Sequence, residues 1–214
     1  MLLVGDSHAA TLLPPLKLLA TRNNWNLTLA YHAGCTFSLV ERNKTPRGKA
    51  CFGWNEALQV ELAKVAPFDV VITAGYAKNR LADMSRVTES ALADGLAAAW
   101  QPLIDRGSTV VAVRDNPEMT TAMKACWETQ DNLAVDCTMR ASDAFVTDPA
   151  VRAAANTDSV KLLDLTDVYC PQATCSAVIG GTYVYRNADH ISATYARSMT
   201  LILGKRLQDL LGGF

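Results

Sequence analysis

A serine follows a short apolar stretch near the start of the chain, in the run Gly5-Asp6-Ser7-His8. Residues 2–4 are typical of a buried strand, and Gly5 lets the backbone turn sharply after it. Ser7 would then stand at a helix N-terminus, where backbone N–H groups favour negative charge. A hydroxyl there can attack a carbonyl carbon, and the N–H of Ser7 can bind the resulting oxyanion. The alternative is that Ser7 is only a helix N-cap.

A histidine stands near the other end, in the run Asn187-Ala188-Asp189-His190. It immediately precedes an amphipathic stretch that predicts a long helix, with Ser192 as its N-cap. A histidine in that place can act as the general base for Ser7. Taken alone, it is better explained as a surface-loop residue or a helix cap. His8 is predicted to lie at the surface of the first helical turn or at the mouth of a cleft.

The charge balance and the hydropathy pattern disfavour several classes of protein. The 214 residues include 20 Lys and Arg against 21 Asp and Glu, so the net charge is −1. A near-neutral chain has no electrostatic signature of nucleic-acid binding. No apolar run approaches the roughly 18 residues that a spanning helix needs, which disfavours an integral membrane protein. The length favours a single domain, 1–214.

The six cysteines fall into three pairs that are close in sequence. Six cysteines allow 15 pairings, so the sequence alone does not fix them. The simplest pairing is local. Disulfides are favoured over free thiols because the cysteines lie in predicted loops rather than in apolar strands, and disulfides indicate an oxidising compartment. A metal site is not expected, because there is no C-x-x-C and the histidines stand at no ligand spacing from the cysteines. The local pairs are Cys35 with Cys51, Cys126 with Cys137, and Cys170 with Cys175.

Strand-like and helix-like stretches alternate along the chain. Strands are expected at residues 2–4, 25–31, 68–74, 108–113 and 160–165, and helices at 81–100, at 142–156 and from 192 to the C-terminus. This order predicts an α/β fold: a three-layer α/β/α sandwich with a mostly parallel, roughly five-stranded, flavodoxin-like sheet. Ligands of such sheets bind beyond the carboxyl ends of the strands, where Gly5–His8 would lie.

The two ends together resemble the SGNH branch of the GDSL hydrolase and esterase family. That family has a serine in a Gly-Asp-Ser motif after the first strand and an Asp-x-x-His motif before the last helix. Further stretches look like the extracytoplasmic SGNH domain that is fused behind membrane proteins of the acyltransferase-3 family. The resemblance runs from Leu3 to about Leu211. The stretches that carry it are residues 4–9, Gly34-Cys35, 164–175 and 185–192.

The resemblance implies roles for individual residues. Ser7 is the expected nucleophile and His190 the general base, while the N–H groups of Ser7 and Gly34 would form the oxyanion hole. The family's third oxyanion donor is an asparagine after the third strand. Here Asn79 comes later than the family's spacing, so it either reaches in from a longer loop or the donor is absent.

The family's aspartate position is occupied by Asn187. Asp189 adjoins His190, but a sequence neighbour is not expected to fold back onto the same imidazole face. Three readings follow: Asn187 orients His190 through its amide oxygen, His190 works in a dyad with Ser7, or the site is impaired. We favour a working site in which Asn187 or Asp189 supports His190.

The function implied by the resemblance is transfer of an acetyl or other small acyl group, through a seryl ester, onto hydroxyls of a cell-surface glycan. A carbohydrate O-acetylesterase and a catalytically impaired glycan-binding module are the alternatives. No cofactor is implied. Because the cysteines indicate disulfides while no export signal precedes the first strand, we expect an extracytoplasmic domain tethered through an upstream transmembrane acyltransferase domain. The alternative is a cytoplasmic protein with reduced cysteines.

Overall fold

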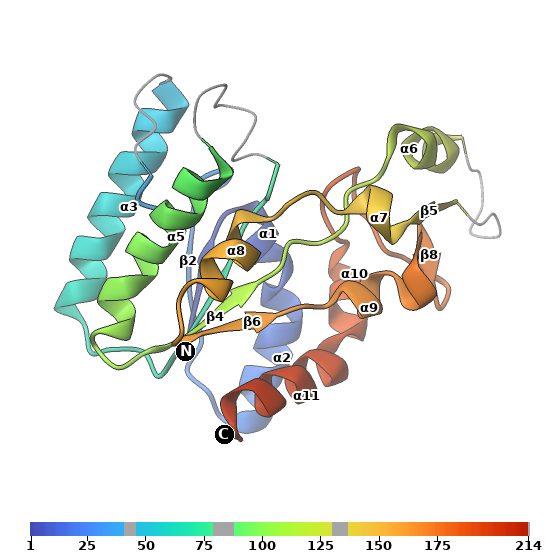
Figure 1. The fold of residues 1–214 in the computed structure, drawn as a ribbon. Helices are drawn as coiled ribbons and strands as arrows, with labels where there is room; N and C mark the ends of the chain where they lie inside the picture. Colours follow the sequence, from blue (N-terminus) through green and yellow to red (C-terminus); the bar gives the residue numbers. More distant parts are fainter. Residues whose placement is uncertain (41–45, 79–87, 130–136, 214) are drawn as a thin grey trace. The chain divides into compact units, whose positions relative to one another are not determined.

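The computed structural model describes residues 1–40, 46–78, 88–129 and 137–213. Its central feature is a five-stranded sheet in which every strand is parallel to its neighbours (Figure 1). Helices flank this sheet, so the predicted α/β class and strand number are confirmed. The strands are β1 (Leu2–Gly5), β2 (Thr28–Tyr31), β3 (Val70–Ala74), β4 (Thr109–Val113) and β6 (Val160–Leu163).

The strand order is β2-β1-β3-β4-β6. It is the 2-1-3-4-5 order of flavodoxin-like sheets, counted along the chain. The order reverses between β1 and β3, so the loops that leave these two strands diverge. Such a reversal point is where open α/β sheets place their ligands. Ser7 follows β1 at this point.

One face of the sheet packs on helices α3 (Pro46–Lys64), α5 (Glu89–Ile104) and α8 (Pro149–Ala155). The strand register places Leu2, Val71, Val110 and Val160 in one row across the sheet. Trp100 of α5 is fully buried in the same core. Strand residues of the opposite face are buried too, as continuous apolar strands of a parallel sheet require.

Two of the predicted helices are interrupted. The stretch predicted as one helix at 142–156 forms α7 (Ala141–Ala144) and α8, because Asp148 caps the second helix by accepting a hydrogen bond from the N–H of Ala150 at 2.9 Å. The C-terminal stretch forms α10 (Ala193–Ser198) and α11 (Thr200–Leu211). The predicted N-cap is confirmed, since Ser192 Oγ accepts from the N–H of Tyr195 at 3.1 Å.

The chain divides into two compact units. The first contains the sheet and comprises Met1–Ala10, Asn26–Arg114 and Thr147–Leu163. The second comprises Thr11–Trp25, Asp115–Val146 and Asp164–Phe214. Besides α7, α10 and α11, the second unit holds α2 (Leu13–Asn23), α6 (Thr121–Glu128), α9 (Thr166–Tyr169), the antiparallel pair β5 (Thr138–Arg140) and β7 (Thr174–Ser176), and the hairpin β8 (Val178–Ile179) and β9 (Thr182–Tyr183).

All six cysteines are joined in the predicted local pairs. The Cys35–Cys51 bridge lies in the first unit and ties the loop after β2 to α3. The Cys126–Cys137 and Cys170–Cys175 bridges lie in the second unit. Each closes a short stretch of chain and so restricts the unfolded state.

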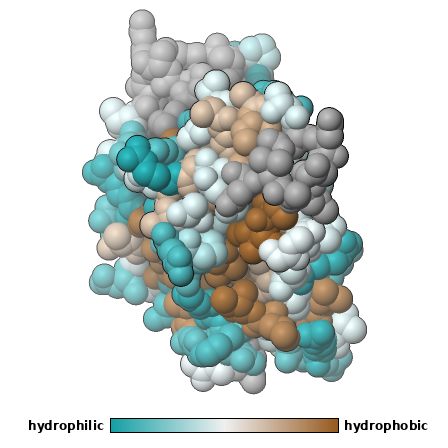
Figure 2. Space-filling view, turned by 90° about the vertical axis from the view of Figure 1, so that its right-hand side faces the viewer, coloured by the Kyte–Doolittle hydropathy of each residue, from teal (hydrophilic) through white to brown (hydrophobic). Residues whose placement is uncertain are grey.

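None of the helices within the described residues is long and apolar enough to cross a lipid bilayer. On the face drawn in Figure 2, hydrophobic residues gather in the middle and lower part and are bordered by hydrophilic residues. Exposed apolar side chains are usual on folded proteins. Among the described residues, the most exposed large hydrophobic side chain is that of Leu201 in α11.

The buried carboxylate of Asp6 joins three loops at the carboxyl edge of the sheet. Its Oδ1 accepts from the N–H of His8 at 2.9 Å, at the start of α1 (Ser7–Thr11). Its Oδ2 accepts from the hydroxyl of Thr36 at 3.3 Å and from the N–H of Tyr76 at 2.9 Å. Thr36 follows β2 and Tyr76 follows β3, so one side chain fixes all three loops.

Gly5 makes the close approach of β1 to β3 possible. Its φ is +147°, and a Cβ atom at this position would lie 1.8 Å from the carbonyl oxygen of Ala74. A side chain here would force the end of β1 away from β3. The glycine is therefore required by both backbone conformation and packing.

We predict that Gly5→Ala lowers the free energy of unfolding by about 3 kcal/mol, because the added methyl group overlaps backbone atoms of β3. Urea denaturation followed by circular dichroism measures this change. Gly53→Ala is the control: it lies inside α3 with nothing within 4 Å of the added Cβ, so it should be neutral or stabilising by up to about 1 kcal/mol. Equal effects of both substitutions would contradict the argument.

We predict that Asp6→Asn costs about 2 kcal/mol of unfolding free energy, although the side chain keeps its shape. An amide presents only one acceptor atom, so at least one buried donor among Thr36, Tyr76 and His8 loses its partner. Denaturation beside the exposed control Asp158→Asn tests this. A loss no larger than that of the control would show that Asp6 does not hold the loops together.

Candidate active site

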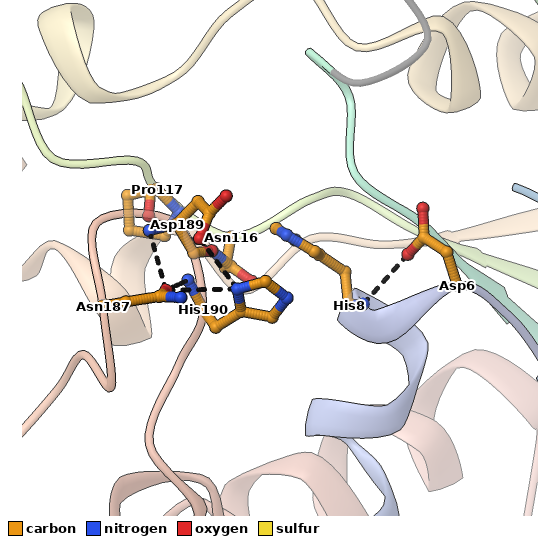
Figure 3. A network of polar contacts seen from close by, with 7 residues as sticks. All are labelled: Asp6, His8, Asn116, Pro117, Asn187, Asp189 and His190. Atoms are coloured by element: carbon orange, nitrogen blue, oxygen red, sulfur yellow. Dashed lines mark hydrogen bonds and ion pairs between the residues drawn. The ribbon is translucent and has the colours of Figure 1, made fainter. Parts of the chain in front are cut away.

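Ser7 is the first residue of α1 and directly follows Gly5 and Asp6 at the end of β1. The Asp6 carboxylate fixes the N–H of His8 and thereby the first turn that carries Ser7 (Figure 3). Asp6 is therefore a structural residue of this turn. Its role is wider than the turn around Ser7, because the carboxylate also holds the loops after β2 and β3.

Gly34 lies on the loop after β2 in the same unit as Ser7. Its φ is +69°, and a Cβ atom would lie 1.7 Å from Nη2 of Arg47. The loop is fixed by the Cys35–Cys51 disulfide and by Asn55, whose side-chain amide donates to the carbonyl oxygen of Thr36 at 3.0 Å. Gly34 is thus held in a left-handed conformation that L side chains rarely adopt.

His8 differs from its expected position. It lies on the first turn of α1, but only 3% of its surface is exposed. Its ring stacks on that of Tyr76, with centroids 4.6 Å apart and planes at 18°. The surface alternative is wrong, because the loop after β3 supplies an aromatic partner that is remote in sequence; the alternative that His8 lies at the mouth of a cleft stays a prediction. Asn79, the expected third oxyanion donor, lies outside the described residues.

The second unit brings Asn187, Asp189 and His190 together (Figure 3). Nδ1 of His190 lies 2.7 Å from Oδ1 of Asp189 and 3.1 Å from Oδ1 of Asn187. The expectation that Asp189 cannot fold back onto the neighbouring ring is therefore wrong. The side chains of Asp189 and His190 are 28% and 15% exposed, so their contact is partly shielded from water.

A tight turn explains how two adjacent side chains meet. Oδ1 of Asn187 accepts from the N–H of His190 at 2.8 Å and from the N–H of Asp189 at 3.3 Å. An asparagine that accepts from the backbone two and three residues ahead bends the chain into a turn. The turn places the carboxylate of Asp189 on the Nδ1 side of His190. The asparagine at the family's aspartate position is thus a turn-forming residue.

Asn116 also holds this turn, a role that the sequence analysis did not find. Its side-chain amide donates to the carbonyl oxygen of Asp189 at 2.8 Å and to that of Pro117 at 3.2 Å (Figure 3). The N–H of Met119 donates to the carbonyl oxygen of Ala188 at 2.8 Å. One feature of the sequence indicated that Asn116 has a role: it lies just after a predicted buried strand, and the loops at the carboxyl ends of parallel strands are where such folds bind ligands.

Three buried tyrosines of the second unit do not compete with His190 as a base. Tyr169, Tyr185 and Tyr195 lie in this unit, and burial raises the pKa of each hydroxyl. For Tyr195 burial raises the pKa to about 12. These hydroxyls stay protonated at neutral pH, and His190 is the one histidine in the sequence of this unit.

The two units each present groups that are known from acyl-transfer chemistry. The first presents a serine at the start of a helix and a glycine loop whose N–H groups can bind an oxyanion. The second presents an imidazole whose Nδ1–H can donate to a carboxylate, which makes Nε2 the basic nitrogen. A serine and a carboxylate-oriented histidine are the components of nucleophilic acyl transfer.

Comparisons with known proteins agree with this fold. The chain is similar to the solved periplasmic domain of the Salmonella ser. Paratyphi A lipopolysaccharide acetyltransferase, with a TM-score of 0.66 and 13% sequence identity. The match covers 99% of this chain and 81% of that one. No curated protein sequence matches the chain. Residues 1–204 match the family model of the SGNH domain that is fused to AT3 domains, and the chain therefore belongs to this SGNH domain family.

Proposed function

We propose that this domain transfers an acetyl or other small acyl group to a hydroxyl of a cell-surface glycan, through an ester formed on Ser7. The observation that carries the proposal is the 2.7 Å contact between Nδ1 of His190 and the carboxylate of Asp189. This contact would orient the imidazole of His190 as a base, although the family's aspartate position is occupied by Asn187. The similar Salmonella domain belongs to a lipopolysaccharide acetyltransferase, which supports an acyl group and a glycan as substrates.

The first half of the reaction acylates the enzyme. Nε2 of His190 takes the proton of the Ser7 hydroxyl while Oγ attacks the carbonyl carbon of the acyl donor. The N–H groups of Ser7 and Gly34 donate to the oxyanion that develops. The bond to the leaving group then breaks, and the proton on Nε2 passes to the departing atom. The acyl group is left on Oγ of Ser7.

The second half transfers the acyl group. His190 takes the proton of a sugar hydroxyl, whose oxygen attacks the seryl ester. Collapse of the second tetrahedral intermediate breaks the ester bond, and the proton returns to Oγ of Ser7. Throughout, Asp189 keeps the proton on Nδ1 and stabilises the imidazolium that forms. Water in place of the sugar would give hydrolysis instead of transfer.

We further propose that residues 1–214 form one domain on the outer side of the cytoplasmic membrane, joined to an upstream membrane acyltransferase domain. Three disulfides fit an oxidising compartment. One family model spans parts of both compact units, and that family is fused to AT3 domains. The membrane domain would deliver the acyl donor, and this domain would complete the transfer.

We predict that Ser7→Ala and His190→Ala each lower turnover of 4-nitrophenyl acetate by at least about 10³-fold, because nucleophile and base act as one unit. Release of nitrophenol is followed by absorbance, with Ser159→Ala as an exposed control that should keep full activity. Mass spectrometry of added oligosaccharides then distinguishes transfer from hydrolysis. Wild-type turnover equal to that of Ser7→Ala would exclude the catalytic role in the isolated domain.

We predict that Asp189→Ala lowers kcat by about 10³-fold with little change in KM, because the imidazole loses the carboxylate that fixes its tautomer. Asn187→Asp in the same chain should recover much of this loss, since Oδ1 at position 187 already lies 3.1 Å from Nδ1. The exposed Asp209→Ala serves as the control. If Asp189→Ala keeps full kcat while Asn187→Ala loses it, the amide rather than the carboxylate orients His190.

A further inference from the structure

A pocket of about 410 Å³ opens in the second unit between the start of α6, strands β5 and β7, and helix α7. This volume falls in the range of about 300–1,000 Å³ that small-molecule sites occupy. No step proposed above uses this pocket. The residues that line it include three threonines, an ion pair, a methionine and an alanine: Thr120, Thr138, Thr174, Arg140, Asp143, Met139 and Ala122.

The polar groups of the pocket come from one face of the β5–β7 pair. Thr138 and Arg140 are two residues apart on β5, so their side chains share a face. The register places Thr174 of β7 directly opposite Arg140. Thr120 adds a third hydroxyl from the N-cap of α6, where its oxygen accepts from the N–H of Met123 and its proton can still be donated.

The ion pair makes the pocket polar without giving it a net charge. Nε of Arg140 lies 2.9 Å from Oδ2 of Asp143, and Nη2 lies 3.3 Å from Oδ1. The hydrogen bond from Arg140 holds the pKa of Asp143 below its ordinary value, so the group is a carboxylate. Among the described residues Nη1 of Arg140 has no hydrogen-bond partner. Donors and acceptors with balanced charge suit a neutral polyhydroxylated ligand better than an anion or an apolar one, although the side chains of Arg140 and Asp143 are 81% and 41% exposed.

Two of the three disulfides fix the walls of this pocket. Cys126 lies in α6 and is bonded to Cys137, which precedes β5. Cys175 lies in β7 and is bonded to Cys170. The pocket is therefore held in shape before any ligand binds, which lowers the entropic cost of binding.

The pocket is connected to the turn that carries His190 within the same unit. The N–H of Met119 donates to the carbonyl oxygen of Ala188 at 2.8 Å, two residues before His190. Thr120, the next residue along the chain, lines the pocket, and consecutive Cα atoms lie about 3.8 Å apart. The backbone at one wall of the pocket is therefore hydrogen-bonded to the turn that carries His190.

We propose that this pocket is an acceptor subsite, which binds a neutral saccharide unit adjacent to the one that is acylated. The assignment as an acceptor subsite rests on the proposed function of His190. Binding of a sugar in the pocket does not depend on that function. The pocket would set which glycan is acylated by hydrogen bonds from the threonine hydroxyls and Arg140.

The test is titration of the ¹⁵N-labelled chain with galactose, rhamnose and N-acetylglucosamine, followed by amide chemical shifts. We expect saturable shifts at Thr120, Thr138 and Thr174 with at least one of these sugars. Ala122→Trp fills the pocket and should abolish them. The double substitution Thr138→Val and Thr174→Val should raise the Kd about tenfold, as expected for the loss of two neutral hydrogen bonds.

The matched control is Ala125→Trp, an exposed position on the same helix that does not line the pocket. It should bind sugar as the wild type does, and thermal melting of every variant checks that each is folded. Shifts confined to other residues, no saturable shift with any of the three sugars, or unchanged binding by Ala122→Trp would each overturn the proposal.

The outcomes separate this inference from the proposed function. Ser7-dependent turnover of 4-nitrophenyl acetate without sugar-induced shifts at the pocket would leave the catalytic proposal standing and exclude the subsite. Saturable shifts at the pocket without Ser7-dependent turnover would support a saccharide-binding pocket and exclude its role as an acceptor subsite of this catalyst.

Discussion

The buried carboxylate of Asp6 is the group on which the position of Ser7 depends. It accepts hydrogen bonds from loops that follow three different strands. A buried carboxylate is costly unless donors surround it, and the backbone N–H groups at the carboxyl edge of a parallel sheet supply them. The same contacts fix the loops on which Ser7 and Gly34 lie. Removing this one acceptor would leave several strand ends without a common partner.

The contact between Asp189 and His190 depends on a turn rather than on the sheet. Asn187 accepts from two backbone N–H groups and bends the chain, so that Asp189 and His190 face each other despite being adjacent. Asn116 and Met119 hold the outside of the turn. The carboxylate that the family carries three residues before its histidine is here supplied one residue before it. The chemistry requires an oxygen at Nδ1 and does not require a fixed sequence position.

The family accounts for the fold and is itself fused to AT3 domains, while the proposed reaction rests on particular side chains. One α/β scaffold can support hydrolysis or transfer, since the two differ in which hydroxyl reaches the acyl-enzyme. The walls of a pocket in the second unit carry two disulfides and a set of hydroxyls.

The sequence by itself determined the α/β class and the roughly five strands, because apolar periodicity marks each element. It indicated the local disulfides as the simplest of 15 pairings, and the structure decided among them. The roles of Ser7 and His190 are implied by the motifs near the two ends of the chain and stay predictions. The tertiary structure alone decided the burial of His8 against Tyr76, the reach of Asp6 across three loops and the contact of Asp189 with His190. These depend on loops that are distant in the chain or on the direction of side chains within a turn. Contacts between distant loops and side-chain directions within a turn leave no periodic pattern in the sequence, because they are set by packing and not by the types of neighbouring residues.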